Sequence, residues 1–418
     1  MQDLFAAQLE ALRAASLDRH LREISSSQGA EIEIDGRRLV NFSSNDYLGL
    51  ANDPRLREAA MAAIDEFGLG AGASRLISGT QSPHVRLEHA LAKWKETQAA
   101  LSFSSGYAVA LGTIPALVTK DDVILLDKLC HASLIDGAKL SGAILRVFPH
   151  NNLRKLESLL EWARRAHPGT RVLVLTESVF SMDGDRAPLR DLVGLKKRFG
   201  ALLMLDEAHA VGVIGTNGRG LAAEENVSES VDVQMGTLSK ALGASGAYIC
   251  GSRSLIEWLI NRARSFIYST APPPAIAAAA TAAVDFLASP EGEKRRLLLW
   301  ERINLLHKLL LSFDVGRSTL SVGRSNLVGQ PSTPNAQRPT LNEATSAIFP
   351  LIIGDKQAAL DLAAALQSKG FLVPAIRYPT VAKDSARLRI TVTASHDEDQ
   401  IRALCQEIAP KLVSTFPL

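Results

Sequence analysis

From about residue 85 onward, short apolar runs alternate with longer segments of helical pattern, and this alternation constrains the fold more than any other feature of the chain. The runs are too short for buried helices and suit strands. Five of them lie at 123–126, 145–148, 172–175, 202–205 and 247–250. Nearly continuous apolar strands separated by helices are typical of a mostly parallel sheet covered on both faces. The sequence therefore predicts an α/β fold.

The chain of 418 residues is long enough for two or three domains. We expect residues 1–50 to supply an amphipathic helix and a short hairpin that turns at Asp35-Gly36. Residues 51–288 are the predicted large domain, and residues 289–418 the predicted smaller α+β domain. The latter is expected to contain an Ala/Leu-rich helix at 358–368 and an Arg-rich strand at 386–393. A polar insertion at about 316–347 interrupts this smaller domain, and a surface loop is favoured there over a substrate lid.

Composition and charge exclude several classes of protein. Lys and Arg number 46 against 44 Asp and Glu, so the basic excess of a nucleic-acid binder is missing. Hydrophobic residues make up 46%, which excludes a disordered chain. The three cysteines are too widely spaced for a disulfide framework or a zinc site. No secretion signal or membrane span is visible, so we expect a cytoplasmic protein.

Polar and titratable residues follow four of the predicted strands. Ligands of parallel sheets bind where the carboxyl ends of the strands meet, so these residues are expected to share one site. Three of the segments follow strands given above: Asp127–Ser133, Thr176–Asp185 and Asp206–His209. The fourth, Gly236–Lys240, follows a further predicted strand at 231–235. One such segment is common, but four together indicate a functional site.

A carboxylate, imidazoles, hydroxyls and one lysine suit pyridoxal phosphate (PLP). Lys240 is the candidate amine for a Schiff base, Asp206 the candidate partner of the pyridine nitrogen, and His131 can stack on the ring. Ser104–Tyr107 opens a helical segment that can hold the phosphate, with Thr237 adding a hydroxyl. Each residue alone also has an ordinary interpretation: a surface lysine, a helix-capping aspartate or a turn histidine.

A glycine-rich segment at 68–74 raises the alternative of a dinucleotide site. No apolar strand precedes it, and the dinucleotide fingerprint requires one. A flexible segment near the active site is the favoured interpretation. The second glycine-rich segment, 215–220, is interpreted as a turn, with a phosphate cradle as the alternative.

Taken together, these motifs resemble those of the α-oxoamine synthases, PLP enzymes of the aspartate-aminotransferase-like fold (fold type I). The resemblance implies a large domain with a mostly parallel seven-stranded sheet, and it covers almost the whole chain outside 316–347. It is carried by Asn41–Leu50, Gly68–Leu76, Phe103–Tyr107, His131–Ser133, Ser178–Asp185, Asp206–Gly220, Gly236–Gly243, Phe266–Thr270 and Ala386–Arg389.

The resemblance also implies a role for each matching residue. Lys240, Asp206 and His131 are expected to be catalytic and to hold the cofactor ring, with Ser181 and His209 near its phenolic oxygen. Gly106, Tyr107 and Thr237 would hold the phosphate, and Thr270 would reach the phosphate pocket of the neighbouring subunit in a homodimer. Arg389 and Asn45 would bind the amino-acid carboxylate, and Arg22 would lie near the entrance for the acyl substrate.

Among members of the family, the motifs look most like those of the enzymes that condense L-alanine with a pimeloyl thioester to 8-amino-7-oxononanoate in biotin biosynthesis. Sister activities that use glycine or serine, such as glycine C-acetyltransferase, remain the alternative, and an inert partner subunit is a remote one. The acyl carrier is coenzyme A or an acyl carrier protein. An acidic carrier would suit three arginines of the insertion: Arg317, Arg324 and Arg338. The favoured interpretation is that these arginines lie in a solvated loop.

Overall fold

The computed structural model describes residues 2–312 and 344–415. These residues form two compact units. The larger unit comprises Asn45–Glu301 and Thr345–Ala347, and the smaller one combines Met1–Ser44 with Arg302–Ala344 and Ile348–Leu418. The three-part division at residues 50 and 288 stays a prediction. Positions 316–343 of the predicted insertion, with its three arginines, lie outside the described residues.

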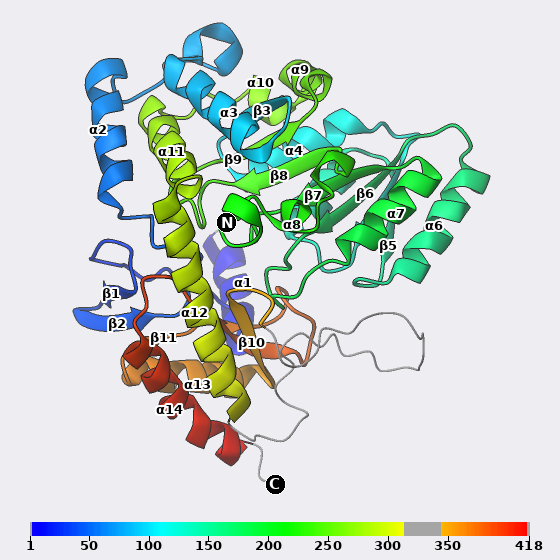
Figure 1. Cartoon of the computed structure of the whole chain (residues 1–418). Coiled ribbons are helices and arrows are strands. Elements are labelled where there is room, and N and C mark those ends of the chain that lie inside the picture. The colour runs from blue at the N-terminus through cyan, green and yellow to red at the C-terminus, as the bar shows by residue number, and fades with distance from the viewer. Residues whose placement is uncertain (1, 313–343, 416–418) are drawn as a thin grey trace. The chain divides into compact units, whose positions relative to one another are not determined.

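A seven-stranded sheet forms the centre of the larger unit, in the order β3-β9-β8-β7-β6-β4-β5 (Figure 1). Five neighbouring strands from β8 to β5 are parallel, and β9 runs antiparallel to both β8 and β3. The prediction of a mostly parallel seven-stranded sheet is confirmed. The strands are β3 Ala99–Phe103, β4 Val123–Asp127, β5 Ile144–Phe148, β6 Val172–Glu177, β7 Leu202–Asp206, β8 Val233–Thr237 and β9 Ala247–Gly251.

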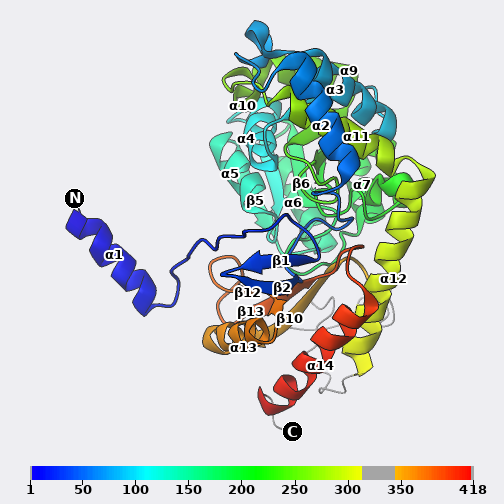
Figure 2. The same cartoon turned by 90° about the vertical axis from the view of Figure 1, so that its left-hand side faces the viewer.

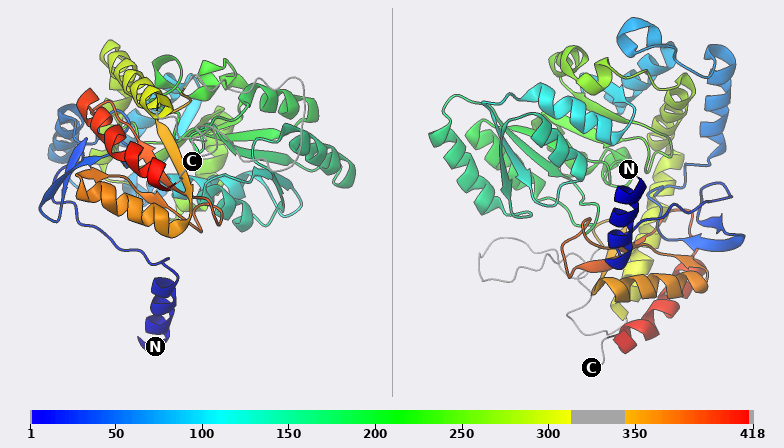
Figure 3. Two further views of the ribbon diagram at one scale, coloured as in Figure 1. Left: turned by 90° about the horizontal axis from the view of Figure 1, so that it is seen from below. Right: turned by 180° about the vertical axis from the view of Figure 1, so that it is seen from behind.

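Helices cover this sheet on both faces, as Figures 1 and 3 show from opposite sides. Leu173 and Leu175 pack into a buried cluster with residues of α4, α5 and α9, whereas Val174 between them is buried on the other side. The helices of the larger unit are α2 Pro54–Phe67, α3 Ser82–Lys95, α4 Gly106–Leu117, α5 Ala132–Leu140, α6 Leu153–Ala166, α7 Leu189–Phe199, α8 Leu221–Glu224, α9 Arg253–Arg262, α10 Arg264–Ile267 and α11 Pro274–Leu287, and α12 Pro290–Ser312 runs on into the smaller unit.

Capping side chains fix where several of these helices begin. Ser105 accepts a hydrogen bond from the N–H of Ala108 at the start of α4, and Asn152 accepts one from Lys155 at the start of α6. At α5 the cap is His131, whose ring accepts from the N–H of Ser133. Such caps satisfy N–H groups that a helix leaves unpaired at its first turn. They place the helix N-termini directly after the strand ends.

The smaller unit contains two three-stranded sheets, β1-β2-β11 and β10-β13-β12 (Figure 2). The predicted hairpin is present, and Asp35 and Gly36 both have positive φ, as its tight turn requires. The predicted helix near 358–368 and strand near 386–393 are also present. The elements are α1 Gln2–Ala14, β1 Glu31–Ile34, β2 Arg37–Asn41, β10 Ile348–Gly354, α13 Lys356–Ser368, β11 Phe371–Leu372, β12 Ala375–Ile376, β13 Ala386–Thr391 and α14 Glu398–Thr415.

Candidate active site

Four parallel strands of the larger unit end in polar residues at the same edge of the sheet. β4 ends at Asp127, β6 at Glu177, β7 at Asp206 and β8 at Thr237. Strand register places Glu177 directly beside Asp206. The carboxyl end of a parallel sheet is where ligands bind in such folds. The structure therefore brings together the strand ends from which the sequence predicted a site.

Asp206 is a buried carboxyl, 5% exposed, at the centre of this edge. Burial raises its pKa, while the positive charge of Lys240 and a hydrogen bond from the N–H of Ala208 (2.9 Å) act in the opposite direction. Since the raising effect is the larger one, these partners compensate the buried charge only in part. A further cation at Asp206 would therefore favour the ionised carboxylate.

Lys240 lies three residues after β8, in a turn whose backbone is tightly held. The N–H of Gly243 donates to the carbonyl of Lys240 (2.9 Å), and Leu238 and Ala244 bond to each other across the same turn (2.9 Å). The charge of Lys240 lowers the pKa values of Glu177 and His131 as well as that of Asp206. The lysine therefore acts electrostatically on three of the groups gathered at this edge.

His131 begins α5 and leaves one ring nitrogen free to donate. Its Nδ1 accepts from the backbone N–H of Ser133 (3.2 Å) and lies 2.8 Å from the Ser133 hydroxyl oxygen. A nitrogen that accepts from an N–H carries no proton, so the proton of the neutral ring is on Nε2. Burial of part of the ring and the nearby Lys240 charge lower the pKa of His131. The exposed imidazole is thus a neutral Nε2–H donor near pH 7.

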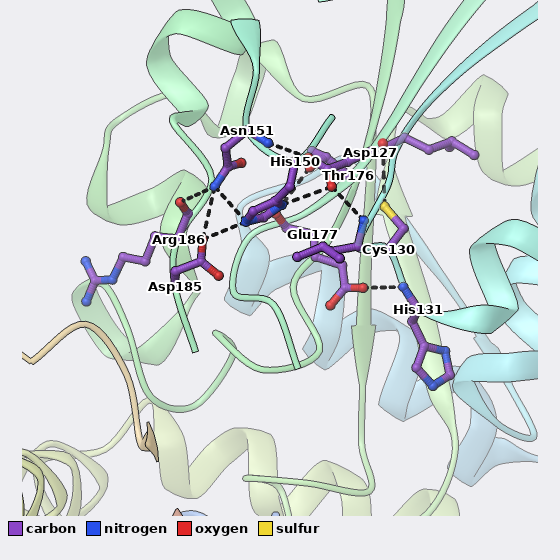
Figure 4. A network of polar contacts seen from close by, with 11 residues as sticks. Asp127, Cys130, His131, His150, Asn151, Thr176, Glu177, Asp185 and Arg186 are labelled. Atoms are coloured by element: carbon purple, nitrogen blue, oxygen red, sulfur yellow. Dashed lines mark hydrogen bonds and ion pairs between the residues drawn. The ribbon is translucent and has the colours of Figure 1, made fainter. Parts of the chain in front are cut away.

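Glu177 is a functional candidate that the sequence analysis did not assign. Its carboxyl is 2% exposed and accepts a hydrogen bond from the backbone N–H of His131 (Figure 4). Burial and the adjacent Asp206 raise the pKa of Glu177 to about 8. Its position at a strand end was the one signal in the sequence that could have identified it.

The predicted phosphate-binding residues meet at the start of α4. A Cβ on Gly106 would lie 3.1 Å from Cγ2 of Thr237, so the absence of a side chain lets the two segments approach closely. Tyr107 is exposed, and its hydroxyl donates to Asp136. The hydrogen bond to Asp136 raises the pKa of the Tyr107 phenol. The N–H groups of the first turn of α4 and the Thr237 hydroxyl suit an anion.

Two of the predicted residues, Asn45 and His209, contact Tyr47. The Tyr47 hydroxyl lies 2.7 Å from Nδ1 of His209 and donates to Oδ1 of Asn45 (3.3 Å). His209 and Ser181 are both buried, the latter in the turn after β6. The structure thus links His209 to Asn45 through a tyrosine to which the sequence analysis gave no role.

Three further predicted residues lie elsewhere. Thr270 is exposed and forms a backbone bridge with Ser74, which ties it to the first glycine-rich segment. Arg22 and Arg389 belong to the smaller unit. Arg389 is buried in β13, and its N–H donates to the carbonyl of Pro374 (3.1 Å). Arg22 is exposed and donates to the side chain of Gln367 (3.0 Å).

The residues of the larger unit fit PLP. A protonated pyridine nitrogen would supply the cation that the buried Asp206 lacks, and Lys240 supplies the amine that the aldehyde requires. Gly106 and Thr237 form a close-packed cradle at a helix N-terminus. Within the described residues, no group of three or more His, Cys, Asp or Glu side chains is placed to hold a metal ion. Nor does any helix among them combine the length and apolar character needed to cross a membrane.

Comparison with known proteins agrees with this chemistry. Residues 37–408 match the family described as aminotransferase class I and II. The solved structures that match include a serine palmitoyltransferase with PLP, with a TM-score of 0.86 and 27% identity over 99% of this chain and 98% of that one. The chain therefore belongs to the aminotransferase class I and II family, whose enzymes depend on PLP.

Within that family the chain groups with the 8-amino-7-oxononanoate synthases. The protein of that name from Geobacter sulfurreducens is 45% identical over 95% of this chain and 94% of its own length. The one from Methylorubrum populi is 44% identical over 97% and 94%. A solved 8-amino-7-oxononanoate synthase from Francisella tularensis matches with a TM-score of 0.72 and 29% identity over 90% of this chain and 98% of that one.

Proposed function

We propose that this chain condenses L-alanine with a pimeloyl thioester to form 8-amino-7-oxononanoate, carbon dioxide and a free thiol, a step of biotin biosynthesis. The observation that carries the proposal is the 45% identity, over 95% of the chain, to a synthase of that name. The candidate active site supports it, since an amine, a buried carboxylate and a neutral histidine are gathered at one sheet edge.

PLP supplies an electron sink for the bond changes at the α-carbon of the amino acid. Lys240 supplies the amine that would hold the cofactor aldehyde and, when unattached, a base for the α-proton of alanine. Asp206 would pair with the pyridine nitrogen and keep it protonated. His131 would stack on the ring, and its Nε2–H is the donor available for the negative charge that develops on the acyl oxygen.

The remaining predicted residues bind and orient. The phosphate would be held by backbone N–H groups at Gly106 and Tyr107 and by the hydroxyl of Thr237. Ser181 and His209 would lie near the phenolic oxygen. Asn45 and Arg389 bind the carboxylate of alanine, for which the planar guanidinium of arginine is suited. Arg22 lies at the entrance for the acyl chain.

We further propose that the enzyme is a homodimer that acts in the cytoplasm. Thr270 then contributes to the phosphate pocket of the neighbouring subunit. The exposure of Thr270, and its backbone bridge to Ser74, support a role that reaches outside its own subunit.

One observation favours a second candidate function, the condensation of serine or glycine with another acyl thioester. The solved serine palmitoyltransferase from Sphingomonas wittichii matches with a TM-score of 0.86 and 30% identity over 99% of this chain and 97% of that one. The higher identity to the 8-amino-7-oxononanoate synthases argues for alanine. The amino acid that the site selects decides between the two.

The first experiment is an absorbance titration of the purified enzyme with L-alanine, glycine and L-serine, followed by pimeloyl thioester. We expect a PLP band that responds to alanine at the lowest concentration, and release of thiol only after the thioester is added. A stronger response to glycine or serine would move the protein to a sister activity. A protein that neither holds PLP nor responds to it would instead be an inert relative.

Variants of two residues test the roles within this site. Lys240→Ala is expected to abolish turnover and the covalent attachment of PLP, which mass spectrometry after borohydride reduction detects. Asp206→Asn is expected to retain some PLP and to lower kcat by at least about a hundredfold, because the ring nitrogen loses its carboxylate. Turnover at the wild-type rate in either variant would remove that residue from the mechanism.

A further inference from the structure

A buried histidine to which the proposed function gives no role lies between two carboxylates (Figure 4). Nδ1 of His150 lies 3.0 Å from Oδ1 of Asp127, and Nε2 lies 2.7 Å from Oδ2 of Asp185. The His150 side chain is 8% exposed. The amide nitrogen of Asn151 lies 3.2 Å from Nε2 as well, but its two hydrogens have acceptors in Oδ2 of Asp185 and the carbonyl of Arg186. Ionised carboxylates only accept hydrogen bonds, so both ring nitrogens carry protons. The geometry therefore makes His150 an imidazolium cation.

The first carboxylate, Asp127, ties the turn that leads to His131. Oδ1 of Asp127 accepts a hydrogen bond from the N–H of Leu129 (2.9 Å) as well as facing His150. Oδ2 accepts from the N–H of Asn151 (2.8 Å), which fixes the segment that carries His150. Asp127 is fully buried, so these bonds form away from bulk water and strongly constrain the turn.

The second carboxylate, Asp185, closes the turn that carries Ser181. The N–H of Phe180 donates to the carbonyl of Asp185 (3.0 Å), and the amide of Asn151 donates to its Oδ2 (3.1 Å). Oδ1 of Asp185 is buried, with no hydrogen-bond partner in the described part of the chain. The Asp185 carboxylate therefore depends on His150 and Asn151. The ring of Phe180 also meets His150 edge-on, with centroids 4.3 Å apart.

We propose that His150 is a positioning residue, a cationic clamp that holds the His131 turn and the Ser181 turn in one fixed geometry at the PLP edge of the sheet. It acts through Asp127 and Asp185. The inference rests on the proposed function, because His131 and Ser181 act there through PLP. The pairing of β4 with β6 is registered as far as Leu126 and Leu175. Beyond that pairing, side chains join the two turns: Glu177 accepts from the N–H of His131, and His150 links Asp127 to Asp185.

The charges around His150 determine the pH range over which its ring stays protonated. Burial lowers the pKa of His150, but the hydrogen bonds that its ring donates to Asp127 and Asp185 outweigh that effect and raise the pKa to about 10. Arg186 is the next charged residue along the turn, and its guanidinium bonds away from the clamp to the carbonyl of Thr345 and the carboxylate of Glu224. The cation is therefore expected to persist through the neutral pH range.

The protonation state is tested without activity, by ¹⁵N NMR of the holoenzyme labelled at histidine. We expect an imidazolium with both N–H protons retained at pH 8.5, and the loss of that signal in His150→Gln. A neutral ring at pH 8.5 would overturn the clamp. Only the assignment of the signal needs the variant, since a wild-type spectrum without any imidazolium at pH 8.5 overturns the clamp by itself.

The positioning role is tested by the pH dependence of PLP affinity in Asp185→Asn. This change removes one of the two carboxylates, so the pKa of His150 falls toward its ordinary value. The ratio of variant to wild-type Kd for PLP is expected to be near one at pH 6 and to rise about tenfold by pH 9. A ratio that does not change with pH would show a merely structural role and overturn the proposal.

A matched control separates cofactor positioning from general damage to a buried histidine. His307→Gln replaces a buried histidine of α12 whose ring lies against Phe349. We expect both His150→Gln and His307→Gln to lower Tm, and only His150→Gln to weaken PLP binding, by about tenfold. Equal PLP affinity in the two variants would contradict the clamp. If wild-type protein binds PLP but does not condense alanine, the proposed function fails while this comparison still stands.

Discussion

At the scale of single residues, the unusual feature of the site is a pair of buried carboxyls side by side. Glu177 and Asp206 are strand neighbours, and the effect of burial and of Asp206 is to hold Glu177 protonated near pH 7. The pair then carries one negative charge instead of two. That charge rests on Asp206, where Lys240 and the proposed pyridinium lie. Glu177 thus accepts the hydrogen bond from the backbone N–H of His131 and, being neutral, does not compete with Asp206 for the proposed pyridinium.

Glu177→Gln is predicted to make the cofactor-free protein more stable than wild type at alkaline pH. The raised pKa of Glu177 means that the folded state binds its proton more tightly than the unfolded state does. Wild-type stability is therefore lost as pH rises from 4.5, the ordinary value, through about 8. Glutamine has no proton to lose, so the Tm of the variant should exceed that of wild type by about 2 °C or more at pH 9.

Calorimetry at pH 5 and pH 9 checks this prediction, since the advantage should be absent at the lower pH. An advantage of equal size at both values would mean that Glu177 is ionised in the folded protein. The hydrogen bond from the N–H of His131 is kept in the variant, because the amide oxygen of glutamine also accepts.

The sequence indicated some of these residues and not others, for a physical reason. Lys240, Asp206 and His131 could be predicted because each follows a strand and matches one chemical requirement of PLP. The roles of Glu177 and His150 depend on partners 46, 23 and 35 positions away. Neighbouring parallel strands bring those partners together, and no local pattern records the contact.

At the scale of elements, the turn after β8 depends on a glycine. Gly243 has φ +64°, and a Cβ there would lie 2.3 Å from the backbone carbon of Leu50. Gly243→Ala is predicted to destabilise the protein and to shift Lys240, whose carbonyl accepts the Gly243 N–H. The loss should be roughly 1–3 kcal/mol beyond the conformational penalty, because backbone cannot yield as a flexible side chain can.

Gly200→Ala is the matched control for that turn. Gly200 has φ +66°, and a Cβ added there would meet no atom within 4 Å. Its replacement by alanine therefore costs only the penalty of a left-handed backbone conformation, about 1–2 kcal/mol. Urea unfolding and the Kd for PLP measure both variants. Gly243→Ala should lose more stability and also PLP affinity, whereas Gly200→Ala should keep its affinity. Equal losses of stability and of PLP affinity in the two variants would show that the Gly243 turn does not position Lys240.

The elements themselves followed well from the sequence where they are long and periodic. The five predicted apolar runs are all strands, and the helix and strand of the C-terminal part are present near the predicted positions. The two-residue strand β11 was not predicted, and it pairs in parallel with β2 far earlier in the chain. A strand so short has no period of its own, so its place depends on tertiary contacts.

At the scale of the whole molecule, the larger unit exposes apolar side chains on segments that a backbone bridge joins. Ile77 is 80% exposed and Tyr268 71% exposed, and the bridge between Ser74 and Thr270 links their segments. Exposed apolar side chains gathered in this way mark interaction surfaces. The proposed homodimer would cover them and bring Thr270 to the neighbouring phosphate pocket.

Ile77→Glu is therefore predicted to weaken dimerisation by about tenfold or more and to lower PLP affinity with it, because a charge would be buried in the interface. Leu140→Glu, which changes an apolar residue 63% exposed at the end of α5, is the control and should do neither.

Light scattering over a dilution series measures the dimer, and PLP fluorescence measures the affinity at each concentration. PLP affinity of the wild-type protein should then fall on dilution together with the dimer fraction. An affinity that stays constant while the protein becomes monomeric would show that each subunit holds the phosphate alone, and Thr270 would lose its proposed role.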